Sequence, residues 1–191
     1  MKKKLLIAAA AILVIALAVG GSMAAFTADV TTVNKITMGS VKLAVHQYHV
    51  DENGTRSAWK DADAVNVVPG EKVSQIVTVE NTGSSDAWIR VKPVMSVALA
   101  EENKDATVDI SMIGLDGTAA ANWTQKDGWY YYTKALKAGA TTEPVYTGIA
   151  FAAAMDNAWQ GSSVQVTVDA QGVQSANNGS SALTATAWPA A

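Results

Sequence analysis

The chain has 191 residues, 14 basic and 17 acidic side chains, and no cysteine. A hydrophobic content of 49% with only 16% charged residues supports a folded core and argues against a disordered chain. The lack of cysteine excludes a disulfide framework, a thiol nucleophile and a thiolate metal site. Apart from the three lysines at positions 2–4, the chain carries 11 basic and 17 acidic groups, a net charge of −6. This balance argues against nucleic acid or an anionic lipid surface as a partner.

An apolar run at residues 5–19 follows these lysines and precedes two glycines, which end a helix. As a helix this run spans roughly 22 Å, which is short of the roughly 30 Å hydrocarbon core of a bilayer. Ser22 and Ala24 then place small residues before a signal-peptidase site, so that Ala25 becomes the new N-terminus. We therefore predict a cleaved signal peptide at residues 1–24, with an uncleaved membrane anchor as the alternative.

The segment that cleavage would free, residues 25–40, has the composition of a strand. Phe26, Ala28 and Val30 share one face of an extended chain. Such a strand can add to an open sheet edge of another molecule, where main-chain hydrogen bonds give affinity and alternate side chains set the register. We expect a donor strand that joins subunits, with the assembly residues Phe26, Ala28, Val30, Val33 and Ile36. The alternative is that these residues form the first strand of a monomeric sandwich, or a frayed tail.

Beyond residue 40 apolar and polar residues alternate with period two, as in half-buried antiparallel strands. The clearest stretches are 40–48, 71–81, 87–92 and 162–173. In the last one, the residues expected to face the core are Val164, Val166, Val168 and Ala170, and those expected to face solvent are Gln165, Thr167, Asp169 and Gln171. The sequence therefore predicts an all-β fold, an antiparallel β-sandwich of jelly-roll type at residues 41–191, preceded by the cleavable signal helix.

Turn signals separate these stretches. Asn53-Gly54 predicts a type I′ hairpin, because both central residues of that turn need positive φ. Helical turns are expected only at 96–104 and 150–160. The stretch near 101–127 is the least patterned part of the chain, and we predict that it is a loop-rich insertion.

His46 and His49 are the two histidines of the chain. Zinc peptidases commonly hold two histidines one helical turn apart with a glutamate base, as in His-Glu-x-x-His. Here both histidines lie in a predicted strand, where residues three apart point to opposite faces. Acidic loops at 61–63 and 105–109 match no known calcium-loop spacing. We therefore predict no catalytic, cofactor-binding or metal-binding residues, no cofactor, and no enzymatic activity.

An aromatic run occupies positions 129–132. In a strand Trp129 and Tyr131 lie on one face, whereas Tyr130 and Tyr132 lie on the other, so one pair must be outside the core or in an interface. These four residues form a candidate surface aromatic patch. Aromatic platforms can bind sugars, but packing against the core and a neighbouring molecule is the preferred interpretation.

Three stretches together resemble the TasA/camelysin (CalY) family of exported Gram-positive surface and biofilm-matrix proteins. Residues 20–29, GGSMAAFTAD, are similar to the family's Gly-Gly-Thr-x-Ala-x-Phe-x-Asp junction, with Ser in place of Thr and Asp one position late. Residues 38–43 resemble its Gly-x-Leu-x-Leu first strand, with Val41 in place of the first leucine. The turn at 157–161 and the alternating strand after it resemble the family's closing section. The resemblance covers about half of the chain, and the junction is fairly specific as a unit.

The resemblance implies an exported structural subunit of jelly-roll fold that polymerises into extracellular fibres by donor-strand exchange. The freed N-terminal segment would add a strand to the next subunit, after a signal peptidase of the SipW type has cut the leader. The implied partners are copies of the same chain and a related minor subunit, and the implied location is the cell surface or biofilm matrix of a Gram-positive bacterium. Contact with a membrane is expected only through the uncleaved leader.

Two other functions stay open at this point. Camelysin-like relatives have been classed as metallopeptidases, so a surface metallopeptidase is one alternative, and a monomeric adhesin-like binding domain that uses the aromatic residues is the other. Loss of proteolysis in EDTA would favour the peptidase, whereas fibres that persist in EDTA would favour the structural role. Removing residues 25–37 would abolish a polymer but leave an adhesin's ligand binding intact.

Overall fold

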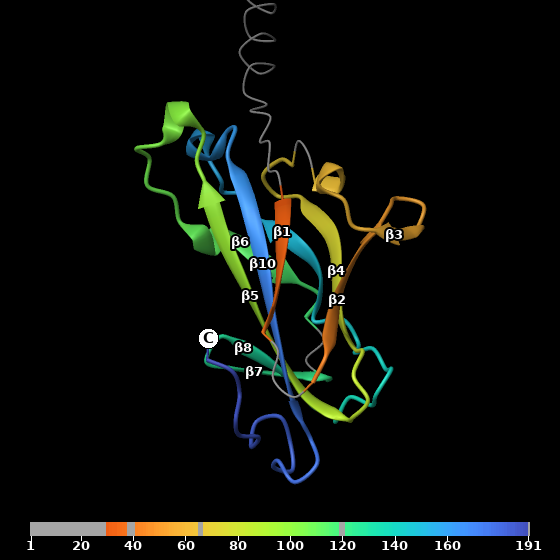
Figure 1. The fold of residues 1–191 in the computed structure, drawn as a ribbon. Helices are drawn as coiled ribbons and strands as arrows, with labels where there is room; N and C mark the ends of the chain where they lie inside the picture. The colour runs from red at the N-terminus through yellow and green to blue at the C-terminus, as the bar shows by residue number, and fades with distance from the viewer. Residues whose placement is uncertain (1–29, 38–40, 65–66, 119–120, 191) are drawn as a thin grey trace, which may run out of the picture.

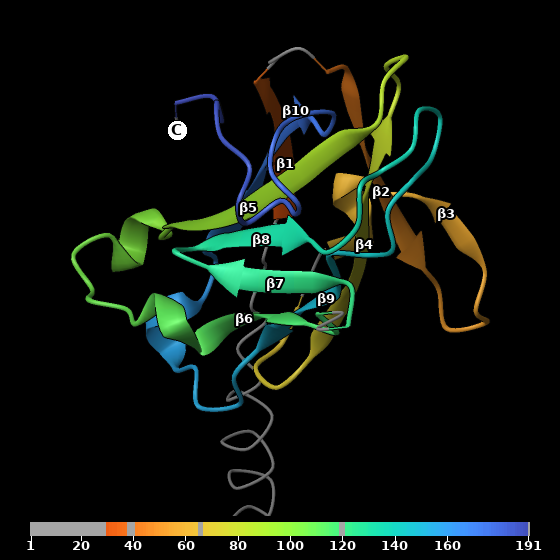
Figure 2. The ribbon, with the colours of Figure 1, turned by 90° about the horizontal axis from the view of Figure 1, so that it is seen from below.

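The computed structural model describes residues 30–37, 41–64, 67–118 and 121–190. Two five-stranded sheets face each other across a common core (Figures 1 and 2). Sheet I has the strand order β1-β10-β5-β8-β7, and sheet II has the order β3-β2-β4-β9-β6. Neighbouring strands are antiparallel except β1 and β10, which run parallel. The predicted all-β sandwich is therefore confirmed at this level, whereas the predicted signal peptide lies outside the described residues.

In the described residues, four short 3-10 helices lie between some of the strands. The strand bounds are β1 Val30–Thr37, β2 Leu43–Val50, β3 Arg56–Ala58, β4 Lys72–Asn81, β5 Ala87–Ala98, β6 Ile113–Asp116, β7 Trp123–Lys126, β8 Trp129–Tyr132, β9 Tyr146–Phe151 and β10 Ser163–Gln174. The 3-10 helices are η1 Asp61–Ala64, η2 Glu101–Asn103, η3 Ile110–Met112 and η4 Asn157–Trp159. Among the described residues, none of these helices has the length and apolarity needed to cross a bilayer.

The core forms where the inward faces of the two sheets meet, as the period-two pattern predicts. The buried residues of β4 include Val73, Gln75, Val77 and Val79, and those of β10 include Val164, Val166, Val168 and Ala170. Ile89 and Val91 of β5 are also fully buried. Each fully buried valine or isoleucine contributes on the order of 1.5–3 kcal/mol relative to exposure, so these strands supply a substantial part of the driving force for folding.

The outer face of β10 differs from its prediction near the end of the strand. Asp169 is 8% exposed and Gln171 is fully buried, although both were expected to face solvent. The C-terminal segment, residues 175–190, folds back towards this end of sheet I and completes a second apolar cluster. The buried members of that cluster are Trp88, Val173, Ala182 and Ala185. The expectation is wrong because alternation along one strand does not show two later contacts: the C-terminal segment packs beside Val173, and Arg90 of β5 donates to Gln171.

Two hairpins show where turn chemistry can be predicted from sequence. β2 and β3 pair as expected around Asn53-Gly54, but the loop runs over residues 51–55 and only its glycine has a positive φ, of 80°. The predicted type I′ turn is therefore wrong at this position. Asp127 (φ 50°) and Gly128 (φ 78°) join β7 to β8 as a two-residue loop, and this pair has the positive φ values that a type I′ turn requires.

The stretch near 101–127 is more regular than the sequence predicts. It contains η2, η3 and the strands β6 and β7, which form the outer edges of sheets II and I. Each of these strands has only four residues, so its period-two alternation is too short to stand out in the sequence. The helical turns expected at 96–104 and 150–160 are reduced to η2 and η4, because residues 96–98 extend β5.

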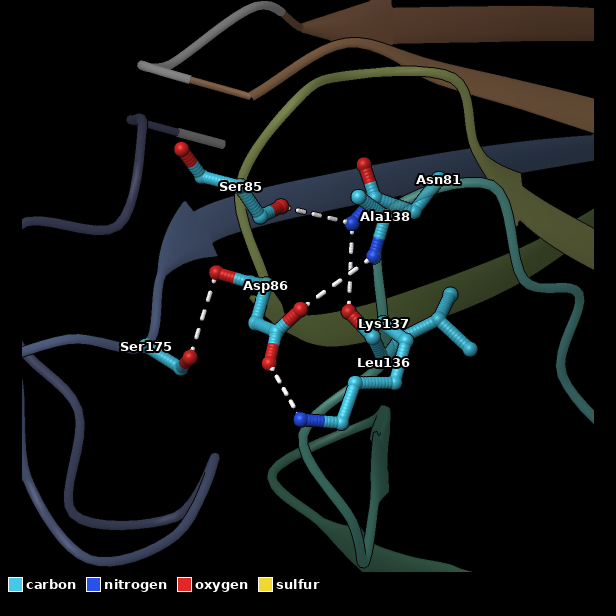
Figure 3. Close-up of polar contacts among 7 residues, drawn as sticks. All are labelled: Asn81, Ser85, Asp86, Leu136, Lys137, Ala138 and Ser175. Carbon is cyan, nitrogen blue, oxygen red and sulfur yellow. Dashed lines mark hydrogen bonds and ion pairs between the residues drawn. The ribbon is translucent and has the colours of Figure 1, made fainter.

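A buried asparagine holds the loop between β4 and β5 in place (Figure 3). Asn81 is fully buried at the end of β4 and donates from Nδ2 to the backbone oxygens of Ser85 at 2.8 Å and Leu136 at 3.1 Å. Its Oδ1 accepts the backbone N–H of Gly83 at 3.1 Å. One side chain thus satisfies three backbone groups that water cannot easily reach.

Asp86 adds a second set of contacts to the same region (Figure 3). Its carboxylate pairs with Nζ of Lys137 at 2.7 Å and accepts the backbone N–H of Ala138 at 3.2 Å. Its backbone oxygen accepts the hydroxyl of Ser175, where the C-terminal segment begins. The hydrogen bond from Lys137 holds the pKa of the Asp86 carboxyl below its usual value. The loop therefore connects the middle of the chain to the C-terminal segment.

Replacing Asn81 by alanine should destabilise the fold, because three backbone groups lose their partner at once. An unsatisfied buried donor or acceptor costs about 1–3 kcal/mol, and partial relaxation should leave a total loss of about 2–4 kcal/mol. Urea unfolding of the chain that begins at Ala25 measures this loss. The exposed Asn53→Ala is the matched control and should change stability by less than about 0.5 kcal/mol. Equal midpoints for the two variants would contradict the role assigned to Asn81.

Candidate assembly edge on strand β10

Strand β1 forms one edge of sheet I and pairs with β10 from Val30↔Val164 to Thr37↔Gln171 (Figure 1). On its other side β10 pairs with β5 along its entire length. Without β1, the N–H and C=O groups on one side of β10 would form an open edge, which is a template for another strand. In the single chain, residues 30–37 are the first strand of the chain's own sandwich.

The register divides the β1 positions between two faces of sheet I. The positions opposite the fully buried residues of β10 are Val30, Thr32, Asn34 and Ile36. Val33 lies opposite Thr167 and so belongs to the outer face, because residues three apart in a strand point to opposite sides. The expected assembly residues Val30, Val33 and Ile36 therefore do not share one face. The remaining expected residues, Phe26 and Ala28, and the cleavage-site residues Ser22, Ala24 and Ala25, lie outside the described residues.

On the outer face of sheet I, the guanidinium of Arg90 lies between two indole rings. Its Cζ is 4.1 Å from the ring centroid of Trp129 and 4.7 Å from that of Trp188 in the C-terminal segment. Nε and Nη2 of Arg90 donate to Oε1 of Gln171 at 2.9 and 2.6 Å. Gln171 in turn donates from Nε2 to Oδ2 of Asp169 at 3.5 Å. A polar network therefore runs from the C-terminal segment to the middle of β10.

The aromatic run on β8 is largely covered and does not form a surface patch. Trp129 and Tyr132 are buried, whereas Tyr130 and Tyr131 are half-buried. The predicted division between two faces is correct, since Tyr132 packs on Trp123 with ring centroids 5.0 Å apart while Tyr131 meets Trp188 edge-on. Arg90 and Trp188 cover the outward pair, and neither residue was among the expected site residues. A lone tryptophan near the end of an unpatterned segment was the available signal that this segment docks on the fold.

The hydroxyl of Tyr132 donates to the carboxylate of Glu143. Burial, and then this hydrogen bond, raise the pKa of Tyr132 to about 12. The same hydrogen bond lowers the pKa of Glu143. Because the neutral phenol is favoured in the fold, this site stabilises the protein below pH about 10 and loses that contribution as the pH rises towards 12.

The histidines of β2 have separate partners. Nε2 of His46 lies 2.7 Å from a carboxylate oxygen of Glu80, and Nδ1 of His49 lies 3.1 Å from the backbone oxygen of Ser74. In the part of the chain that the structure describes, no group of three or more His, Cys, Asp or Glu residues could hold a metal ion.

A cleft of about 500 Å³ lies beside the β2–β3 hairpin and is lined by several carboxylates and Lys72. Asp51 accepts the backbone N–H groups of Asn53 and Thr55, and Asp63 accepts that of Lys60. These carboxylates therefore order their own loops.

The feature of the described chain that is suited to recognition is thus a sheet edge, read by main-chain hydrogen bonds and by alternate side chains. On the outer face of β10, Arg90 donates to Gln171, and on the inner face the side chains of β10 are part of the core. No family model, curated protein or solved structure matches this chain.

Trp188→Ala should loosen the C-terminal segment from sheet I, because it removes one of the two rings around Arg90 and uncovers Tyr131. Loss of the half-buried ring and of a cation–π contact should cost about 1–3 kcal/mol. Urea unfolding and the rate of protease cleavage within residues 175–190 report the effect. Leu183→Ala is the control in the same segment, since this leucine is 42% exposed. Identical cleavage rates for the two variants would show that Trp188 does not hold the segment.

Glu143→Gln should lower the pKa of Tyr132, because it replaces a carboxylate acceptor by a neutral one. The pKa should stay above about 10, since burial is the larger cause of the shift. The difference in tyrosinate absorbance between the parent and Tyr132→Phe isolates this residue during alkaline titration. An unchanged Tyr132 titration in Glu143→Gln would mean that the hydrogen bond has no influence.

Proposed function

We propose that this chain is an exported structural subunit, a jelly-roll sandwich that assembles into fibres when its N-terminal strand completes the β10 edge of the next copy. The observation that carries the proposal is the parallel pairing of β1 with β10 at the edge of sheet I. The edge strand comes directly after the predicted cleavage site, so processing would release its free end. The chain connects this strand to β2 of the other sheet through residues 38–42 alone.

Exchange between copies needs no new kind of contact. A strand from another copy can make the same main-chain hydrogen bonds to β10 and place the same positions on the core side. Within one chain, a short connection gives the strand an effective concentration in the millimolar range, so self-pairing competes with exchange. Each copy that donates its strand leaves its own β10 open, and a head-to-tail contact that does not close into a ring builds a filament.

The location and partners belong to the same proposal. The leader pattern at residues 1–24 supports export, with cleavage by a signal peptidase of the SipW type. The partners would be copies of this chain, with a related minor subunit as a further one, at the surface or in the biofilm matrix of a Gram-positive bacterium. While the leader is attached, one end of the strand is tethered at the membrane, so cleavage would control assembly.

The intramolecular pairing of β1 also favours a second candidate, an exported sandwich that stays monomeric. In that case the strand never leaves its own β10, and the chain acts as a single surface domain. The two candidates make opposite predictions for a chain in which β1 cannot move.

A disulfide between β1 and β10 separates the two candidates, because the chain has no cysteine of its own. Thr31 and Gln165 are register partners on the outer face, and neighbouring strands are roughly 4.8 Å apart, which is within disulfide range. In the double variant Thr31→Cys, Gln165→Cys, oxidation in dilute solution should lock the strand and abolish fibres seen by electron microscopy. Reduction should restore them.

The matched control places the second cysteine at the exposed Thr186, which is not a register partner of any β1 residue. This chain should form fibres whether oxidised or reduced. Strand exchange would be contradicted if the oxidised Thr31→Cys, Gln165→Cys chain formed fibres. It would also be contradicted if the reduced chain stayed monomeric.

A further inference from the structure

We propose that the juxtaposition of Asp169 and Lys35 across the β1–β10 pair selects the register of the N-terminal strand. For the chain's own strand, this inference rests on the observed register. For a strand of another copy, it rests on the proposed function. Asp169 would thus determine specificity at the assembly edge.

Asp169 is a buried carboxylate with incomplete hydrogen bonding. It is 8% exposed, and within the part of the chain that the structure describes its Oδ1 has no hydrogen-bond partner. Its Oδ2 accepts only the long contact from Nε2 of Gln171, at 3.5 Å. A buried carboxylate is costly unless it is paired or fully hydrogen-bonded, so this position requires a cation or a donor close by.

The register supplies two candidates for that cation. Asp169 lies opposite Lys92 on β5 and opposite Lys35 on β1, and residues directly opposite in neighbouring strands share a face at Cβ distances of roughly 4.5–5.5 Å. Nζ of Lys92 lies over the ring of Trp129, at 5.8 Å from the centroid, and Arg90 is engaged with Gln171. In the described residues neither forms an ion pair with Asp169. Position 35 is therefore the neighbour that remains.

The charge pattern of the two strands makes this pair selective. Lys35 is the only charged residue within β1, and Asp169 is the only charged residue within β10. In the observed register the two lie directly opposite each other. A slip by one residue would move Lys35 to the core side, and a slip by two would place Val33 or Thr37 opposite Asp169. Each slip leaves the buried carboxylate of Asp169 without a cation opposite it. The wrong registers are therefore destabilised relative to the observed one.

Two cysteine pairs measure the register directly. Thr31 with Gln165 reports the observed register, and Thr31 with Thr167 reports a slip of two residues on the same face. The ratio of the disulfide formation rates of these pairs should fall about tenfold in Lys35→Met, which corresponds to about 1.4 kcal/mol. Asp169→Asn should produce a similar fall, and combining the two should add little. The exchanged pair Lys35→Asp, Asp169→Lys should recover the parent ratio.

Lys92→Met is the matched control, because it removes the other lysine opposite Asp169. Its ratio should stay at the parent value. If Asp169→Asn fails to fold, Lys35→Met decides the test alone, since it changes only an edge strand. An unchanged ratio in Lys35→Met, or an equal change in Lys92→Met, would overturn the proposal.

The assay needs no fibres, so its failure can be told apart from failure of the proposed function. If Lys35→Met lowers the ratio of disulfide formation rates but the parent chain forms no fibres, the role of Asp169 and Lys35 holds for the chain's own strand and assembly by exchange is wrong. If the parent chain forms fibres but Lys35→Met leaves the ratio unchanged, assembly by exchange holds and Asp169 does not select the register.

Discussion

The fold depends on β10 having a hydrogen-bonded partner on both sides. This strand carries four fully buried residues of the core and is paired with β5 along its entire length, so it cannot be displaced without losing the sandwich. Its second edge is covered by β1, whose backbone completes the pairing of sheet I. The requirement is for a strand with suitable side chains at alternate positions, and it does not specify which copy of the chain provides it. Assembly by exchange is therefore a competition between two sources of the same hydrogen bonds.

The first described strand and the C-terminal segment both contact β10 or its neighbours. The N-terminal strand pairs along its edge, while the C-terminal segment packs near its end through Trp88, Val173 and the Arg90 network. This convergence explains how Gln171 can be polar and buried at once, because Arg90, which lies over Trp188 of the C-terminal segment, donates to its side chain. It also makes the contacts of β10 long-range in sequence, so the edge is completed only when distant parts of the chain have come together.

The sequence was informative where the pattern of side chains is local. Alternation in residues 71–81 and 162–173 correctly placed the core faces of β4 and β10, because a half-buried strand must alternate. Asn53-Gly54 correctly marked a hairpin, but the turn geometry depends on loop length, which the dipeptide does not encode. The short edge strands β6 and β7 were missed, since four residues give too little alternation.

Contacts between distant segments were the other limit. Gln171 accepts hydrogen bonds from Arg90 of β5 and donates one to Asp169, and a rule based on alternation along one strand assigns both residues to solvent. The contact of Arg90 with Trp129 and Trp188 was not predicted either. It joins β5, β8 and the C-terminal segment, which are far apart in the sequence. The parallel register that places Lys35 opposite Asp169 likewise arises only when the two strands are paired.

The central claim is that one copy's N-terminal strand occupies the β10 edge of another. Solid-state NMR tests it most directly, on fibres grown from equal amounts of carbon-labelled and nitrogen-labelled chain beginning at Ala25. The account predicts contacts between the two labels that connect residues 30–37 of one copy with residues 164–171 of its neighbour, in the parallel register. Fibres in which these two segments contact each other only within the same copy would contradict it.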